Sequence, residues 1–132
     1  LDQPANLDVA RLLGAFNVLE AEIKPLDPGR NTSRLQVGDF ELDGPYFPGH
    51  LKGDRVRICV RPEQLTVSAR GGKLERNQIP AELLRTIETP RGIRLEFSSG
   101  IAVALPHTIY TPLRDSRDWV IHFPPESLRV VG

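Results

Sequence analysis

The sequence predicts a mainly β fold of two related small barrels preceded by one short helix, and three observations support this prediction. A twelve-residue stretch occurs twice, as VRICVRPEQLTV at 56–67 and as WVIHFPPESLRV at 119–130, with an offset of 63 residues. Apolar and polar residues alternate in both copies. The chain also contains 12 Pro and 11 Gly in 132 residues, which favours short strands and turns over long helices.

The repeat extends upstream of this stretch. NVLEAEI at 17–23 aligns with NQIPAEL at 77–83, with an offset of 60 residues. Two copies, predicted at 17–75 and 76–132, therefore fill most of the chain. A period of this size indicates two copies of one supersecondary unit.

The recurring stretch predicts a strand, a corner and a second short strand. Alternation with a period of two is typical of a half-buried strand. Its apolar members are Val56, Ile58 and Val60 in the first copy and Trp119, Ile121 and Phe123 in the second. Each strand is expected to end at Pro62 or Pro125, because proline removes a donor from the ladder. Short strands follow at 65–67 and 128–130.

The segment IPAELLRTIE at 79–88 fits either a helix or a strand on its own. Its repeat partner at 19–24 alternates clearly between apolar and charged residues, so both copies are predicted to be strands. The segments 93–97 and 101–105, separated by a Ser-Ser-Gly turn, predict a hairpin. The segment 34–42 is its expected counterpart in the first copy.

Only the N-terminus is predicted to be helical, with residues 1–16 forming a helix and a link. Asn6 can cap this helix, Asp8 lies in its first turn and Gly14 can end it. The chain then holds about ten short strands, and small antiparallel barrels of this strand count are often OB-like.

The composition disfavours two classes of partner. Seventeen basic and 17 acidic residues leave a formal net charge of zero, whereas nucleic-acid binders usually carry a basic excess. Only 6% of the residues are aromatic, which leaves few rings for stacking on bases. No apolar run approaches the roughly 18–20 residues of a membrane span. We therefore expect no nucleic-acid partner and no membrane-spanning helix.

The residues that a catalytic or metal site needs are missing or scattered. Gly72-Lys73 is followed by Leu74, so this stretch does not complete the phosphate-binding pattern G-x-x-x-x-G-K-[ST]. Three histidines share no ligand spacing with the single cysteine: His50, His107, His122 and Cys59. No Ser-His-Asp or Cys-His arrangement can be assembled. We expect no catalytic residue, no metal and no cofactor in this chain.

Arg55, Arg57 and Arg61 point to one side of one predicted strand. The simpler interpretation is a solvated or interface face. The alternative is an OB-type groove for nucleic acid or for an anionic ligand, and the scarcity of aromatic residues disfavours nucleic acid.

Four motifs in chain order carry a resemblance to a known family. They are QPANLDVARLLGAFNVLEAEI at 3–23, VRICVRPEQLTV at 56–67, NQIPA at 77–81 and FPPESL at 123–128. Together they resemble the C-terminal TOBE regulatory domain in the ATPase subunits of bacterial ABC importers of the iron(III), polyamine and sugar type. In that family the fold is a pair of OB-like units that share strands.

The resemblance implies a non-catalytic regulatory and dimerisation domain. ATP and magnesium would be bound by a preceding ATPase domain and not by these residues. The intact protein would be cytoplasmic, at the inner face of the cell membrane, where it would work as a homodimer beneath permease subunits. A regulatory protein or a small ligand is a further possible partner.

An oxyanion-binding module of the same fold is the alternative. ERNQIP at 75–80 resembles the S-A-R-N-x-L-x-G stretch of molybdate-binding proteins, so Arg76 and Asn77 are the candidate anion-binding residues. Leu74 replaces the family's serine, and Glu75 places a negative charge beside the expected anion. These two departures argue against tight binding.

The dimer interface is expected to use one self-complementary patch, as a two-fold contact requires. The candidates combine a fixed backbone with charge: Arg61, Pro62 and Glu63, and Phe123, Pro124, Pro125 and Glu126. The alternative is that both stretches are corners at which strands end.

Overall fold

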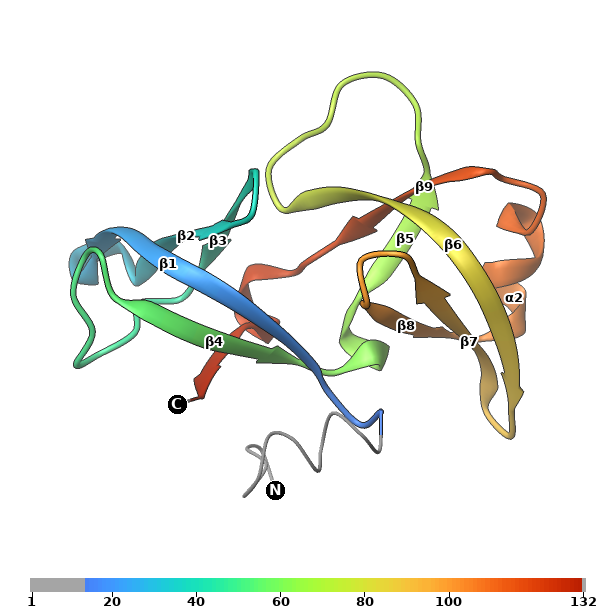
Figure 1. The fold of residues 1–132 in the computed structure, drawn as a ribbon, viewed down its shortest axis with the longest axis horizontal. Helices are drawn as coiled ribbons and strands as arrows, with labels where there is room; N and C mark the ends of the chain where they lie inside the picture. Colours follow the sequence, from blue (N-terminus) through green and yellow to red (C-terminus); the bar gives the residue numbers. More distant parts are fainter. Residues whose placement is uncertain (1–13, 132) are drawn as a thin grey trace.

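Residues 14–131 are described by a computed structural model (Figure 1). They form ten strands in two five-stranded antiparallel sheets, which confirms the predicted fold of two related OB-like units. The predicted helix within 1–16 falls mostly outside the described residues. Among residues 14–131, no helix is long and apolar enough to cross a bilayer.

The two sheets have the same strand order. The first runs β10-β4-β1-β2-β3 and the second runs β5-β9-β6-β7-β8. The first sheet comprises β1 (Asn17–Asp27), β2 (Thr32–Val37), β3 (Phe40–Gly44), β4 (Arg55–Val60) and β10 (Arg129–Val131). The second comprises β5 (Thr66–Ala69), β6 (Gln78–Thr89), β7 (Gly92–Phe97), β8 (Ala102–Leu105) and β9 (Asp118–His122). The orders coincide when β1 to β5 of the first copy are matched with β6 to β10 of the second.

The last strand of each copy belongs to the sheet that is formed mainly by the other copy. β5 pairs with β9, and β10 pairs with β4. A short 3-10 helix stands at each crossing, η2 (Pro62–Gln64) after β4 and η4 (Pro125–Ser127) after β9. η2 contacts β8 of the second sheet, and η4 contacts β3 of the first. The recurring stretch therefore marks the two points at which the chain passes from one unit to the other.

The core is continuous across both units. Ile58 and Ile121, which correspond in the repeat, are both fully buried, as the alternation predicts. Trp119 is also fully buried. Its ring meets the Phe97 ring edge-on at 6.1 Å between centroids and stacks with the Tyr110 ring at 6.3 Å. Aromatic pairs in such geometries stabilise a core beyond the apolar area that they bury.

Most strand predictions are confirmed. The ambiguous segment 79–88 lies in β6, and both hairpins form, as β2-β3 and β7-β8. The expectation that only the N-terminus is helical is wrong, because α2 (His107–Tyr110) and η3 (Thr111–Leu113) follow β8. The stacking of Tyr110 on Trp119 gives these turns a tertiary contact that no local sequence signal announces.

Candidate functional site

The first predicted interface patch is partly buried. Pro62 lies in the interior at the start of η2, whereas Glu63 is exposed. The Arg61 guanidinium lies 5.0 Å from the centroid of the Phe16 ring and 3.9 Å from a Glu63 carboxylate oxygen. Of this patch, the Arg61 and Glu63 side chains are within reach of a second molecule.

The second patch has the same design. Phe123 is 1% exposed and Pro124 is half-buried, whereas Pro125 and Glu126 are exposed. The Ser127 hydroxyl donates a hydrogen bond to the Pro124 carbonyl oxygen at 2.7 Å, which fixes the turn. Both patches are chain crossings, and their exposed residues remain the predicted interface.

Asn77, a predicted anion-binding residue, already has partners within the chain. It adopts a left-handed backbone conformation with φ of 63°. Its side-chain oxygen accepts from the Asp43 N–H at 2.8 Å. Its side-chain nitrogen donates to the carbonyl oxygens of Asp43 at 2.9 Å and of Phe123 at 2.7 Å. Asn77 thus joins β3 of the first sheet to the end of β9 in the second.

Arg76, the other predicted residue, faces carboxylates. Its Nε lies 3.3 Å from Asp43 Oδ2, and its Nη1 lies 3.9 Å from Glu41 Oε1. The other oxygen of the same carboxylate, Asp43 Oδ1, lies 3.6 Å from Arg34 Nε. Asp43 therefore sits between two arginines, and an oxyanion at Arg76 has to compete with it.

A hollow of about 530 Å³ lies next to Asp43 at the end of the first unit. It is lined by Arg30, Asn31, Thr32, Arg34, Asp43, Gly44, Pro45, Pro125 and Glu126. The Arg34 Nε atom is buried and has no hydrogen-bond partner at bonding distance. A buried N–H without an acceptor is uncommon in folded proteins and calls for an explanation.

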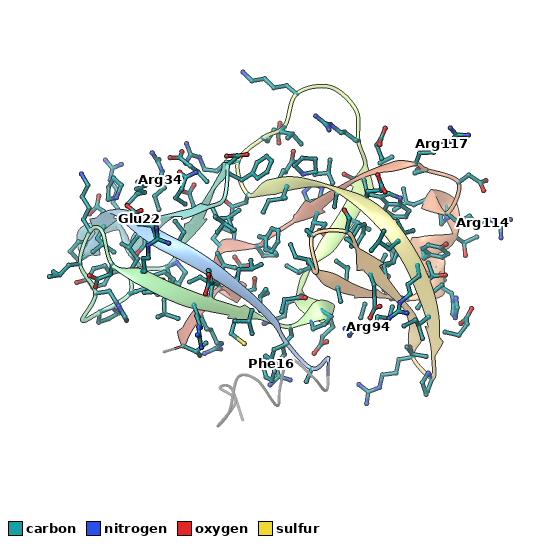
Figure 2. All side chains as sticks on the ribbon, in the orientation of Figure 1. Phe16, Glu22, Arg34, Arg94, Arg114 and Arg117 are labelled. Atoms are coloured by element: carbon teal, nitrogen blue, oxygen red, sulfur yellow. The ribbon has the colours of Figure 1, made fainter. Side chains whose placement is uncertain are left out.

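The repeat counterpart of Arg34 is Arg94, and its situation differs. Figure 2 labels both side chains, one on each sheet. Arg94 Nε donates to Glu96 Oε2 at 3.0 Å, and Arg94 Nη1 donates to the Gly14 carbonyl oxygen at 2.9 Å. The guanidinium of the second unit is thus satisfied internally, while Nε of the first is not.

A second hollow of about 460 Å³ occupies the corresponding place in the second unit. It is lined by Glu63, Thr89, Pro90, Arg91, Gly92, Ile93, Ala104, Leu105 and Pro106. Glu63 replaces Glu126 here, and Ala104 replaces Asp43. The two hollows therefore share a position in the repeat but differ in polarity.

Ser68 and His122 form a pair that sequence analysis did not find, because 54 positions separate them. Ser68 Oγ lies 2.9 Å from His122 Nε2, and Gln78 Nε2 lies 3.4 Å from His122 Nδ1. The Glu75 N–H donates to Gln78 Oε1 at 2.8 Å, which turns the amide nitrogen toward the ring. Ser68 and Gln78 thus hold the His122 ring from its two nitrogens.

The arginine face of the first sheet is neutralised by its neighbours. In the register of β1 and β4, Glu20 stands opposite Arg57 and Glu22 opposite Arg55. Cross-strand pairs of opposite charge stabilise a sheet, and they leave little positive field for nucleic acid. Within residues 14–131, no cluster of His, Cys, Asp and Glu is arranged to hold a metal ion.

The sequence could reveal the hollow at Arg34 only if the register of the β2-β3 hairpin were known. Arg34 stands directly opposite Asp43 in the β2-β3 pairing. The opposite charges at these two positions are a signal, but they gain meaning only once the turn of the hairpin is placed.

Comparison with family models gave no match for this sequence, and comparison with curated protein sequences gave none either. Among solved structures, a molybdate-bound crystal form of the cytoplasmic molybdate-binding protein ModG is similar. The TM-score is 0.73 at 12% sequence identity, and the match covers 86% of this chain and 94% of that one. The chain therefore shares the fold of ModG, a duplicated and mainly β architecture.

Proposed function

We propose that this chain is a non-catalytic binding module and that its ligand is a small oxyanion such as molybdate, held in the hollow between Arg30 and Arg34. The observation that carries this proposal is the buried Arg34 Nε without an acceptor. An oxyanion that takes the place of the Asp43 carboxylate, 3.6 Å from Nε, would supply one, and hydrogen bonds between charged partners are about twice as strong as neutral ones. The fold shared with ModG supports the choice of ligand class.

The charges around the hollow limit its affinity. Arg30 is paired with Asp27 at 3.7 Å but is 85% exposed, so its guanidinium can turn toward a ligand. Asp43 and Glu126 also line the hollow and repel an anion. When an oxyanion takes the place of the Asp43 carboxylate beside Arg34, that carboxylate can remain paired with Arg76. We expect weak binding that falls further as salt screens the charges.

Calorimetric titration with molybdate, tungstate and sulfate at low and at high ionic strength tests this proposal. The expected result is saturable binding at low ionic strength that Arg34→Gln weakens about tenfold or more, because a charge-assisted hydrogen bond contributes about 1.5–3 kcal/mol. The matched control is Arg91→Gln in the second hollow, which should bind as the parent chain does. Absence of binding, or equal loss in both variants, would contradict the proposal.

A second candidate is the regulatory domain of an ABC importer ATPase, and the four sequence motifs favour it. In this proposal residues 1–16 link an ATPase domain to a tandem unit with copies at 17–75 and 76–132. ATP and magnesium belong to the ATPase domain, and the whole protein is cytoplasmic, beneath its permease subunits at the membrane. It acts as a homodimer through the exposed parts of 61–63 and 123–126.

The coding sequence upstream of Leu1 decides between the candidates. A phosphate loop and an L-S-G-G-Q signature in the same reading frame would support the ATPase context. A reading frame that holds neither motif would exclude it and leave the oxyanion module. In either case the described residues should give no ATP hydrolysis and no rise in melting temperature with MgATP, since only a ligand that prefers the native state stabilises it.

A further inference from the structure

One edge of β6 lacks a neighbouring strand over half of its length. β6 pairs with β9 through 78–82 and with β7 at Leu83 and through 85–89, with an irregularity at Leu84, so beyond Glu82 β7 is the one strand paired with it (Figure 1). Within the described part of the chain, no other backbone hydrogen bond reaches 83–89. α2 contributes the His107 side chain, which lies 3.0 Å from Glu88.

The side chains along this open edge suit pairing with another strand. Leu84 is 64% exposed and Ile87 is 39% exposed, and Arg85 and Thr86 between them are exposed as well. β-Branched and aliphatic residues favour strands. An exposed edge with apolar side chains is a ready template for another strand.

The equivalent edge of the first unit is protected. The Ile23 N–H donates to the Asp54 carbonyl oxygen at 2.9 Å, and the Gly53 N–H donates to the Ile23 carbonyl oxygen at 2.7 Å. Lys24 and Pro25 follow in β1. Proline and lysine are residues with which natural sheets block edge pairing. The same edge is thus blocked in the first copy and open in the second.

We propose that the open edge of β6, residues 83–89, pairs antiparallel with the same edge of a second copy of this chain. The two second sheets would then form one continuous sheet across a two-fold axis. This surface differs from the corners 61–63 and 123–126, and the proposal does not depend on oxyanion binding.

The strand can pair with a second copy of itself without like charges facing each other. Opposite residues of an antiparallel pair share a face, so a two-fold axis through the sheet can pass at Thr86. Arg85 then stands opposite the partner's Ile87, on the regular part of the strand beyond the irregularity at Leu84. No like charges face each other, and the segment holds one Arg and one Glu. A seven-residue edge buries less than the roughly 800 Å² per partner of a stable interface, so the dimer should be weak.

Sedimentation analysis over a concentration series up to several hundred micromolar tests this pairing. The expected result is a reversible dimer that Ile87→Lys abolishes. The matched control is Leu51→Lys, which alters a leucine that is 71% exposed elsewhere and should leave the dimer intact. If the chain stays monomeric over this range, self-pairing is wrong, and a strand of another protein becomes the candidate partner of this edge. A dimer that survives Ile87→Lys but dissociates in the double variant Glu63→Lys and Glu126→Lys also overturns it.

Cross-linking tests the register. Directly opposite residues of an antiparallel pair have Cα atoms about 4.5–5.5 Å apart, within disulfide range. Thr86→Cys should therefore give a disulfide-linked dimer under mild oxidation, because the native Cys59 is buried and does not compete. Lys52→Cys, at another exposed position, should stay largely monomeric. Equal cross-linking at both positions would mean random collision and would contradict the register.

Discussion

Asn17 and Ala102 are joined by two hydrogen bonds that hold the two sheets together. The Asn17 side-chain nitrogen donates to the Ala102 carbonyl oxygen, and the Ala102 N–H donates to the Asn17 side-chain oxygen, both at 2.8 Å. Asn77, its counterpart in the repeat, binds Asp43 in the same way. Each asparagine thus caps the edge strand of the opposite sheet, β8 or β3, as a further strand would.

Removing the first of these contacts should destabilise the whole chain. Asn17 is 5% exposed, so Asn17→Ala leaves a buried N–H and a buried carbonyl without partners. Each such group costs about 1–3 kcal/mol, and we expect a loss of about 2–4 kcal/mol in the free energy of unfolding. Urea titration measures it. Gln36→Ala, which removes an exposed bond to Gly38, should change stability by less than about 0.5 kcal/mol.

Gly92 is required by the close approach of β8. A Cβ atom at this position would overlap the Leu105 carbonyl oxygen, which belongs to the backbone and cannot swing away. We expect Gly92→Ala to cost about 3 kcal/mol, the upper end for overpacking. The matched control is Gly71→Ala, because nothing lies within 4 Å of that position. Equal melting temperatures for the two variants would refute this account.

The parts of the fold that follow from local chemistry could be predicted from the sequence. Alternation at 56–60 and 119–123 predicts strands, because one face of each must be buried. Pro62 and Pro125 predict where they end, because proline cannot donate. The repeat settled the ambiguous segment 79–88, since its partner β1 alternates more clearly.

The rest depends on contacts between distant residues. The last residue of α2, Tyr110, stacks on Trp119, and neither residue reveals this contact alone. The hollow at Arg34 is lined in part by Pro125 and Glu126, which come from the other copy. Asn77 illustrates the same limit. An asparagine side chain suits an anion site, but the position of Asn77 in the fold makes it a link between the two sheets.

The free energy of unfolding should decrease at alkaline pH, in part because of Cys59. Burial raises the pKa of its thiol, and the nearby Arg61 and Arg129 offset part of this rise. The folded state then holds the proton more tightly than the unfolded chain, whose thiol titrates at about 8.5. This contribution is fully present below that pH and is lost as pH rises through the folded pKa. Urea titrations at neutral and alkaline pH should show a smaller decline for Cys59→Ala than for the parent chain.

Glu96 should have the opposite effect, so that its contribution to the free energy of unfolding is lost at acid pH. Hydrogen bonds from Arg94 and Arg85 hold the pKa of its carboxyl below the ordinary value. Its contribution is present above the unfolded pKa and is lost as pH falls through the folded one. Glu96→Gln should therefore reduce the loss of stability on acidification. Thermal melts from neutral to acid pH measure this, and parallel curves for the two proteins would argue against it.

Asp43 should be a competitor of the proposed oxyanion, and removing its charge should strengthen binding. Its carboxylate lies 3.6 Å from Arg34 Nε, on the wall of the hollow. Asp43→Asn keeps the shape of the side chain, and the bonds from Asn77 persist because they reach the Asp43 backbone. We expect the affinity for molybdate to rise about tenfold, equivalent to about 1.4 kcal/mol. Glu41→Gln, which removes a carboxylate 3.9 Å from Arg76 but outside the hollow, is the control and should change the affinity little. If Asp43→Asn binds no more tightly than the parent chain in the same calorimetric titration, Arg34 is not the anion-binding group.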